Sequence, residues 1–175
     1  FRRVLFRFVK EAVARGDTTP EWHALTRPMA SEAEATQRGI ALAEMAEAPL
    51  YVVHLTAAEA LEAVRRAKRQ GLPILAETCP QYLRFTEDDV ARVGVYGKVN
   101  PPIRMAADRD ALWAALDDGT LAHVTTDHAG FSAAEKAAHE GDFLSAPPGH
   151  PGTETLLPTL LDGVHEQRLT LEQVA

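Results

Sequence analysis

Cysteine and long apolar runs are scarce in this sequence of 175 residues, and each scarcity excludes a class of protein. The single cysteine, Cys79, cannot form a disulfide within the chain, which favours a reducing, cytoplasmic setting over secretion. We interpret Cys79 as a small buried side chain that follows a strand rather than as a nucleophile. No apolar run approaches the roughly 18 residues needed to span a bilayer, so the sequence predicts a soluble protein.

Positive charge is also in the minority. The chain has 18 Lys and Arg residues against 25 Asp and Glu residues, which gives a formal net charge of −7. Such a chain repels phosphate backbones and anionic lipid surfaces, so we expect neither nucleic acid nor membrane as a partner. The apolar share of 46% and the charged share of 25% are ordinary for a globular domain with one hydrophobic core.

The two ends of the sequence lack features that usually bound a domain. Apolar residues recur at helical spacing over residues 1–15, yet no initiator methionine and no capping residue precede them. These apolar positions are Val4, Leu5, Phe8, Val9, Ala12 and Val13. At the other end, Thr170 and Gln173 predict a capping box, and the chain stops one turn later. We therefore expect residues 1–175 to be an interior segment of a longer polypeptide.

Short apolar stretches alternate with stretches of helical periodicity. Strands are predicted at 50–56, 72–78 and 121–126. Helices are predicted at 1–15, 31–47, 57–71, 86–94, 105–119 and 153–166, the second of them starting with a capping box of Ser31 and Glu34. The alternation predicts an α/β fold with a parallel sheet of about three strands, which cannot by themselves close a barrel of eight.

Several conspicuous side chains are assigned to packing or to solvent. We expect apolar core faces at Leu112, Trp113 and Leu116, and at Leu156, Leu157, Leu160 and Leu161. The basic run at 64–70 is expected to form a solvated helix face. Neither pattern predicts a function.

Two polar residues fall where predicted strands end. His54 closes the apolar stretch LYVVH, and Asp127 immediately follows LAHVTT. Parallel α/β sheets carry their active sites at the carboxyl ends of their strands, and imidazole with carboxylate is a usual donor set for zinc and related ions. A hydrogen-bonded structural histidine and an aspartate that caps a helix or forms a turn are equally compatible with these positions.

The order of seven segments resembles one family, the cyclic amidohydrolases. The most similar branch is that of the dihydropyrimidinases and hydantoinases, with allantoinases and dihydroorotases as near relatives. The segments are GDTTPEWHALTRP, EAEATQRGIALAE, PLYVVHLTAAEAL, AETCPQYL, GKVNPPIR, LWAALDDGTLAHVTTDHAGF and PPGHPGTETLLPTLL. The resemblance implies that residues 1–175 are the carboxyl-terminal part of a TIM (β/α)8 barrel.

The resemblance also implies a centre of two divalent metal ions, usually zinc, bridged by a carboxylated lysine. His54 matches the second of two later histidine ligands, and Asp127 matches the aspartate after the last strand. The bridging lysine, the first later histidine and a His-x-His pair have no counterpart in this segment. With two of six ligands, the isolated chain is expected to bind metal poorly and to catalyse nothing measurable.

In such a centre, a water shared by two cations becomes acidic enough to attack a ring amide near neutral pH. By resemblance, Asp127 is the catalytic residue that binds one ion and takes the proton from this water, while His54 binds the other ion. His128 is expected to support the site from behind the ligands, to line the substrate pocket or to be structural. The remaining histidines are expected to be structural or exposed: His23, His123, His139, His150 and His165.

Substrate binding is expected near Asn100 and Gly149, because backbone groups around the PPIR turn and after the final loop bind the ring in this family. Pro148 stands where many members have asparagine, and proline cannot donate a backbone hydrogen bond. Arg104 is expected either to orient a carboxylate on the substrate or to form a structural ion pair.

The sequence leaves three functions open. The first is hydrolysis of a small cyclic amide, a dihydropyrimidine or hydantoin. The second is an activity of the allantoinase or dihydroorotase type on a cyclic ureide or amide, and the third is a non-catalytic scaffold related to dihydropyrimidinase. Family resemblance further implies a homo-oligomer, a tetramer or a dimer, of the full-length chain.

Overall fold

The computed structural model describes the backbone of residues 2–175 and the side chains of residues 6–175. The expected apolar positions Val4 and Leu5 therefore lie outside the described side chains. The helices and strands are α1 Arg2–Arg15, α2 Glu21–Leu25, α3 Met29–Met45, β1 Leu50–Val52, α4 Ala58–Arg69, β2 Ile74–Thr78, α5 Pro80–Arg84, α6 Glu87–Val93, the 3-10 helix η1 Gly94–Gly97, α7 Ala106–Asp117, β3 His123–Val124, α8 Ala133–Ala137, α9 Leu156–His165 and α10 Leu171–Val174.

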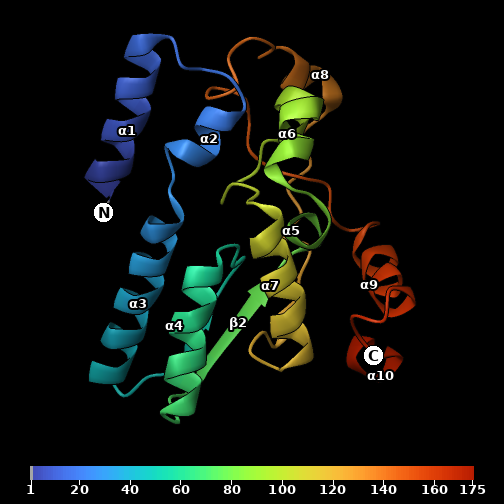
Figure 1. Cartoon of the computed structure of the whole chain (residues 1–175). Helices are drawn as coiled ribbons and strands as arrows, with labels where there is room; N and C mark the ends of the chain where they lie inside the picture. Colours follow the sequence, from blue (N-terminus) through green and yellow to red (C-terminus); the bar gives the residue numbers. More distant parts are fainter. Residues whose placement is uncertain (1) are drawn as a thin grey trace.

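The three strands form one parallel sheet in the order β1-β2-β3. Leu50 pairs with Ile74, and Glu77 pairs with His123. The prediction of an α/β fold with three parallel strands is confirmed, although β1 and β3 are shorter than the apolar stretches that predicted them. Figure 1 shows α3, α4 and α7 side by side along β2, with α9 and α10 at the opposite side of the molecule from α1.

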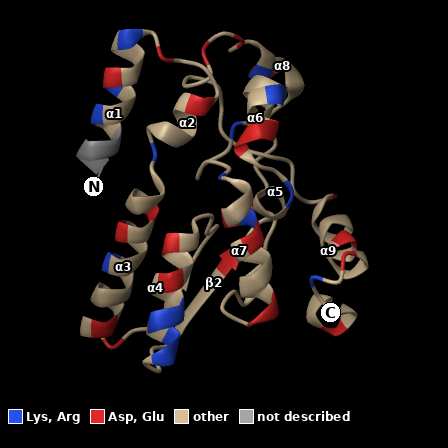
Figure 2. Ribbon diagram, in the orientation of Figure 1, with Lys and Arg blue, Asp and Glu red and all other residues tan. Residues whose placement is uncertain are grey.

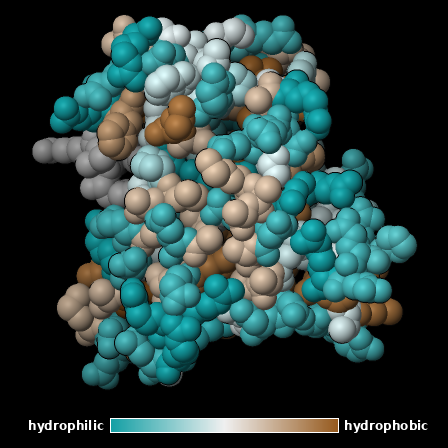
Figure 3. Space-filling view, viewed as in Figure 1, coloured by the Kyte–Doolittle hydropathy of each residue, from teal (hydrophilic) through white to brown (hydrophobic). Residues whose placement is uncertain are grey.

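Helix α4 is amphipathic, and its periodicity explains its place against the sheet. Its buried residues are Ala60, Leu61, Ala63, Val64 and Ala67. Basic residues gather in its last turn, at the end of the helix where the backbone dipole favours positive charge. Figure 2 shows this basic end of α4, and Figure 3 shows that hydrophilic residues predominate on the surface there. The solvated basic face is therefore confirmed.

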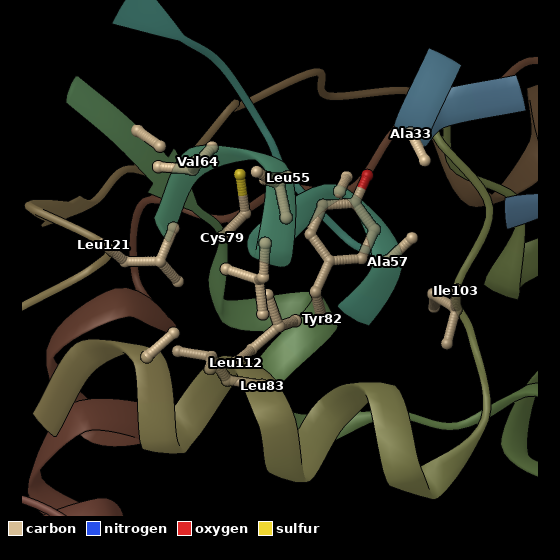
Figure 4. Packing of buried hydrophobic residues seen from close by; sticks show 14 of the residues in the cluster. Ala33, Leu55, Ala57, Val64, Cys79, Tyr82, Leu83, Ile103, Leu112 and Leu121 are labelled. Atoms are coloured by element: carbon tan, nitrogen blue, oxygen red, sulfur yellow. The ribbon is translucent and has the colours of Figure 1, made fainter. Parts of the chain in front are cut away.

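The hydrophobic core lies between the sheet and the helices. Figure 4 shows Leu55, Cys79 and Leu112 among side chains that gather over α7. Burial, and to a lesser extent the negative charge of Asp127, raises the pKa of the Cys79 thiol to about 12. This thiol is therefore protonated and a poor nucleophile. The core positions Leu112 and Trp113 are confirmed, and the Trp113 indole N–H donates to the Leu83 carbonyl at 2.9 Å.

The other face of the sheet exposes large apolar side chains in the described part of the chain, beside the polar side chains of Glu77 and His123. Tyr51, Val53 and Leu75 are each more than two-fifths exposed. Successive side chains of a strand point to opposite faces, so α4 and α7 cover one face while these residues form the other. Parallel strands are ordinarily buried on both faces, and this face is the one that further structure would cover.

Some local predictions were wrong. Helix α3 begins at Met29, two residues before the expected cap, because Pro28 already supplies a favourable start; the Ser31 hydroxyl donates to the Pro28 carbonyl at 2.6 Å. The expected packing stripe on α9 is only half correct, since Leu160 packs against the core while Leu157 and Leu161 are exposed. The capping box that starts α10 is confirmed.

Candidate functional site

The loops that follow β1, β2 and β3 lie at one edge of the sheet, which we call the rim. The Thr78 hydroxyl donates to the Leu55 carbonyl at 2.9 Å, and the Thr125 amide donates to the Thr78 carbonyl at 3.0 Å. Thr78 thus links the residue after His54 to the residue two before Asp127. Both expected ligands therefore follow the carboxyl ends of their strands on the same rim.

The backbone at both expected ligands lies in the left-handed region. The φ angles are 40° at His54 and 41° at Asp127, a conformation that costs energy for residues with a Cβ. Among residues 2–175, two other non-glycine residues share it, Glu47 and Gln167, and each lies two residues beyond the end of a helix, where such a cap is ordinary. No helix ends at His54 or Asp127, so the unusual backbone singles out these two positions.

Asp127 is exposed and His54 is partly exposed. The carboxylate of Asp127 lies close enough to the end of β2 to raise the pKa of Cys79, after the larger effect of burial. It also contributes, after burial and Cys79, to the raised pKa of the Tyr82 hydroxyl.

The donor set at the rim fits a metal of the zinc type, but it is incomplete. An imidazole and a carboxylate on separate strands, held by a parallel ladder, are suitable ligands. Among residues 2–175, however, no group of three or more His, Cys, Asp or Glu side chains is arranged to hold an ion. Any centre at this rim needs further ligands from outside this chain.

His128 fastens two loops together. The Thr153 backbone amide donates to His128 Nδ1 at 3.4 Å, and the Thr153 hydroxyl lies 2.8 Å from the same nitrogen. His128 also pairs with His150 in an isolated parallel bridge, in which the Ala129 amide donates to the His150 carbonyl at 3.0 Å. The residue beside Asp127 therefore holds the loop that follows α8 against the rim.

Two glycines allow this close approach. A Cβ at Gly149 would lie 2.6 Å from the Ala129 Cβ, and a Cβ at Gly152 would lie 2.5 Å from the Thr126 carbonyl oxygen. Real Cβ atoms essentially never approach so closely, so a side chain at either position would push the loop away from Asp127.

The expected substrate residues, Asn100 and Gly149, belong to loops that the structure brings together. The Gly149 amide donates to the Lys98 carbonyl at 3.0 Å, so this N–H is already used and the Gly149 carbonyl is the group left for a ligand. Gly149 is buried and Asn100 is exposed. Lys98 itself was not anticipated from the sequence.

Two buried lysines hold these loops. The Lys98 ammonium donates to the Leu144 carbonyl at 2.6 Å, and the Lys136 ammonium donates to the Lys98 carbonyl at 2.9 Å. Burial lowers the pKa of each lysine to about 8. Nothing in the local sequence marks these two lysines as buried, because lysine on a polar helix or loop is usually solvated.

Arg104 forms an ion pair, one of its two expected roles. It is 7% exposed, and its Nη2 lies 3.2 Å from Glu32 Oε2. A guanidinium that is buried and engaged in this way is not directed at a substrate. Of the two interpretations, the structural ion pair is the one observed.

The other histidines do not join the two expected ligands. His23 is buried, with Nε2 2.8 Å from the Val99 carbonyl oxygen, and burial lowers its pKa to about 3. Burial likewise lowers the pKa of His150 to about 4. His123 lies on β3 and stacks on Tyr51. His139 Nδ1 lies 2.9 Å from the Ser145 hydroxyl.

An apolar cavity of about 660 Å³ lies between α5, α6 and α9. Its walls include Pro80, Phe85, His150 and Pro158. Neither His54 nor Asp127 lines this cavity. The rim, and not this cavity, is therefore the candidate site.

The chain was compared with proteins of known sequence and structure. No protein-family model matches it. It is 44% identical to the D-hydantoinase of Ralstonia pickettii over 165 residues, which are 92% of this chain and 36% of that protein. The resemblance to the hydantoinase and dihydropyrimidinase family is confirmed. The chain thus spans about a third of the length of the hydantoinases it matches.

Solved hydantoinase structures also resemble this chain over nearly its whole length. A D-hydantoinase structure superposes with a TM-score of 0.93 and 42% identity, covering 98% of this chain and 38% of that one. The dihydropyrimidinase of Brevibacillus agri NCHU1002 gives the same TM-score at 38% identity, again over 98% of this chain and 38% of its own. The α/β arrangement of this chain is therefore that of one hydantoinase segment. No helix within residues 2–175 combines the length and the apolar character needed to cross a membrane.

Proposed function

We propose that the protein carrying this chain hydrolyses the ring amide of dihydropyrimidines or hydantoins in a metal-dependent reaction, and that this chain supplies part of the active site. The observation that carries the proposal is the placement of His54 and Asp127 on one rim, both in left-handed backbone. Hydantoinase-like sequence over 92% of the chain supports the same substrate class. The segment would form the carboxyl-terminal part of a TIM barrel, whose active sites lie at this end of the strands.

Asp127 would hold one ion through its carboxylate and accept the proton that the attacking water loses. The same carboxyl group would then donate this proton to the ring nitrogen as that nitrogen leaves. His54 would hold the second ion through an imidazole nitrogen. Two divalent ions, which we propose to be zinc held also by a carboxylated lysine outside this chain, would supply water acidic enough to attack an amide near neutral pH.

The substrate would be a small cyclic amide or ureide held between two loops. Asn100 would contact one amide edge of the ring, and the Gly149 carbonyl would accept from a ring N–H, because the Gly149 amide is already bonded to Lys98. His128 would support Asp127 by keeping the adjoining loops in place. We further propose a cytoplasmic homo-oligomer, a tetramer or dimer, with neither nucleic acid nor membrane as a partner.

The test compares Asp127→Asn with Asp88→Asn in the full-length polypeptide that carries this chain. Asp88 is an exposed carboxylate in the first turn of α6, so its substitution makes the same chemical change away from the rim. We expect Asp127→Asn to lower kcat for hydantoin at least about 100-fold and to lower the metal content per chain. Asp88→Asn should change neither. Equal turnover by both variants would refute the proposal.

A substrate panel separates the remaining functions. Hydantoin and dihydrouracil should be hydrolysed faster than allantoin and dihydroorotate. Faster hydrolysis of the latter two would assign the protein to the allantoinase or dihydroorotase type. Absence of both turnover and bound metal from the full-length protein would indicate the scaffold, although a scaffold has no need of the left-handed backbone at His54 and Asp127.

A further inference from the structure

Helix α4 starts at Ala58, four residues after His54, without a capping side chain of its own. Its N-cap residue is Ala57, whose side chain has no oxygen to accept a hydrogen bond from the backbone amides at the start of the helix. These amides are instead bound by carboxylates from two other helices. The start of α4, and with it the segment that leaves His54, is therefore fixed by residues far away in the sequence.

Glu32 on α3 supplies most of this support. Its Oε1 accepts from the Thr56 amide at 2.7 Å and from the Ala57 amide at 3.0 Å. Its Oε2 accepts from the Thr56 hydroxyl at 2.5 Å. Thr56 is almost fully buried, at 1% exposure, so water cannot replace these bonds.

Arg104 completes the network from the loop before α7. In addition to its ion pair with Glu32, its Nε donates to the Thr56 hydroxyl at 3.2 Å, and its Nη1 donates to the Arg27 carbonyl at 2.6 Å. The Glu32 side chain is 14% exposed, and a largely buried carboxylate with this many charge-assisted bonds is held in one position. The network thus fixes Thr56 through hydrogen bonds to both its backbone amide and its hydroxyl.

We propose that Glu32 and Arg104 are positioning residues for His54. They hold Thr56, two residues beyond His54, so that the backbone at His54 stays in the left-handed region and its imidazole stays on the rim. Leu55 keeps its own bonds to Thr78 and Glu77 without this network, but loss of the bonds at Thr56 would favour the return of His54 to extended backbone, which residues with a Cβ prefer. The proposal rests on the proposed function, in which His54 is a metal ligand, because a ligand must be held within a fraction of an ångström.

Asp108 offers a matched control. This carboxylate on α7 is also buried, at 4% exposure, and accepts from the Ala58 amide at 2.9 Å. It caps the same helix, but its contact lies four residues beyond His54 and does not involve Thr56. A role limited to helix capping would make Glu32 and Asp108 equivalent, whereas a positioning role would separate them.

The experiment uses the full-length polypeptide with Glu32→Gln, Thr56→Val and Asp108→Asn, and measures kcat, KM, thermal midpoint and zinc affinity by competition with a chelator. All three variants should lower the thermal midpoint. Only Glu32→Gln and Thr56→Val should lower kcat and weaken zinc binding, each by about 10- to 100-fold and with KM little changed. Thr56→Ser keeps the hydroxyl, so its kcat and zinc affinity should each stay within about threefold of the parent.

The outcomes separate the two proposals. If His54→Ala abolishes turnover while Glu32→Gln and Thr56→Val bind zinc as Asp108→Asn does, the positioning role is refuted and the proposed function stands. If His54→Ala retains turnover and zinc, the proposed role of His54 as a metal ligand is refuted, and the positioning role falls with it. Should Glu32→Gln fail to fold, the pair Thr56→Val and Thr56→Ser decides, because a structural role predicts equal zinc affinity in both.

Discussion

The helical layer of α3, α4 and α7 and the rim of the sheet are built by different means. In the helical layer, apolar side chains such as Leu61 and Leu112 pack against the sheet, and most charged side chains face solvent, with Asp108 a buried exception. At the rim, His54 and Asp127 have left-handed backbone and the loops are held by the buried ammonium groups of Lys98 and Lys136. The helical layer therefore follows the usual rules of stable packing. The rim instead contains strained backbone and buried charge, at the place where we propose the chemistry.

The Glu32 network joins these two regions. Glu32 belongs to the helical layer by its position on α3, yet its hydrogen bonds reach the segment after His54. A rigid helix can hold a strained loop because its own backbone bonds are satisfied. The comparison therefore predicts that substitutions in the helical layer affect stability alone, except at Glu32 and at residues that contact it.

The largest effect on stability is expected from Leu61→Ala in the helical layer. Leu61 is 0% exposed, so truncation leaves a cavity and should lower the free energy of unfolding by about 2–5 kcal/mol. Denaturant titration of the full-length protein measures this loss. The folded fraction should keep the parent kcat; a tenfold fall in kcat would show that the helical layer and the rim are not separable in this way.

A smaller effect on stability, but a direct one on turnover, is expected from Gly149→Ala. The new Cβ would lie 2.6 Å from the Ala129 Cβ, so the loop must shift, at a cost of about 1–3 kcal/mol. Because this loop lies against the segment after Asp127, kcat/KM for hydantoin should fall even in the fully folded protein, in addition to this loss of stability. Gly141→Ala is a control with no atom within 4 Å of its Cβ, although its φ of 87° also disfavours alanine. Equal kcat/KM for the two variants would contradict the expectation.

The smallest expected effect is the change in the free energy of unfolding with pH that His23 causes. Its folded pKa is lowered to about 3, below the value of about 6.5 expected in the unfolded chain. Above about pH 6.5 both states are neutral and the full stability is present. As the pH falls below this value the unfolded chain binds a proton that the folded chain does not, so stability should fall by about 1.4 kcal/mol per pH unit.

Denaturant titrations at about pH 7 and about pH 5.5 measure this slope. Gln at position 23 can still donate to the Val99 carbonyl but does not titrate, so His23→Gln should show a smaller difference between the two pH values. The same difference in both proteins would assign the slope to other groups. His150, whose pKa is lowered to about 4, would be the next candidate.

Much of the fold could be predicted from local patterns. The three strands, the helices α4, α7 and α9 and the capping box of α10 follow from apolar periodicity and turn residues, which act over a few residues. The short helices α2, α5 and α8 could not be predicted, because five residues carry too little periodicity. The start of α3 was misplaced because two overlapping signals, Pro28 and Ser31, competed over three residues.

The candidate site also has features that local sequence predicts and features that it does not. His54 and Asp127 could be singled out because they end apolar stretches, and the order of motifs indicated the family. The occupied amide of Gly149, the buried lysines and the identity of Glu32 as the partner of Arg104 could not be found, since each joins residues tens of positions apart.

The sequence by itself determined the three strands and most of the longer helices of this protein, their α/β order and the two polar residues at strand ends, because these depend on short-range spacing. Only the tertiary structure decided that Glu32 caps α4 and fixes Thr56, 24 residues away. The reason is physical: a carboxylate has the same local preferences wherever it stands on a helix, and its partner is chosen by what folding brings within hydrogen-bond distance.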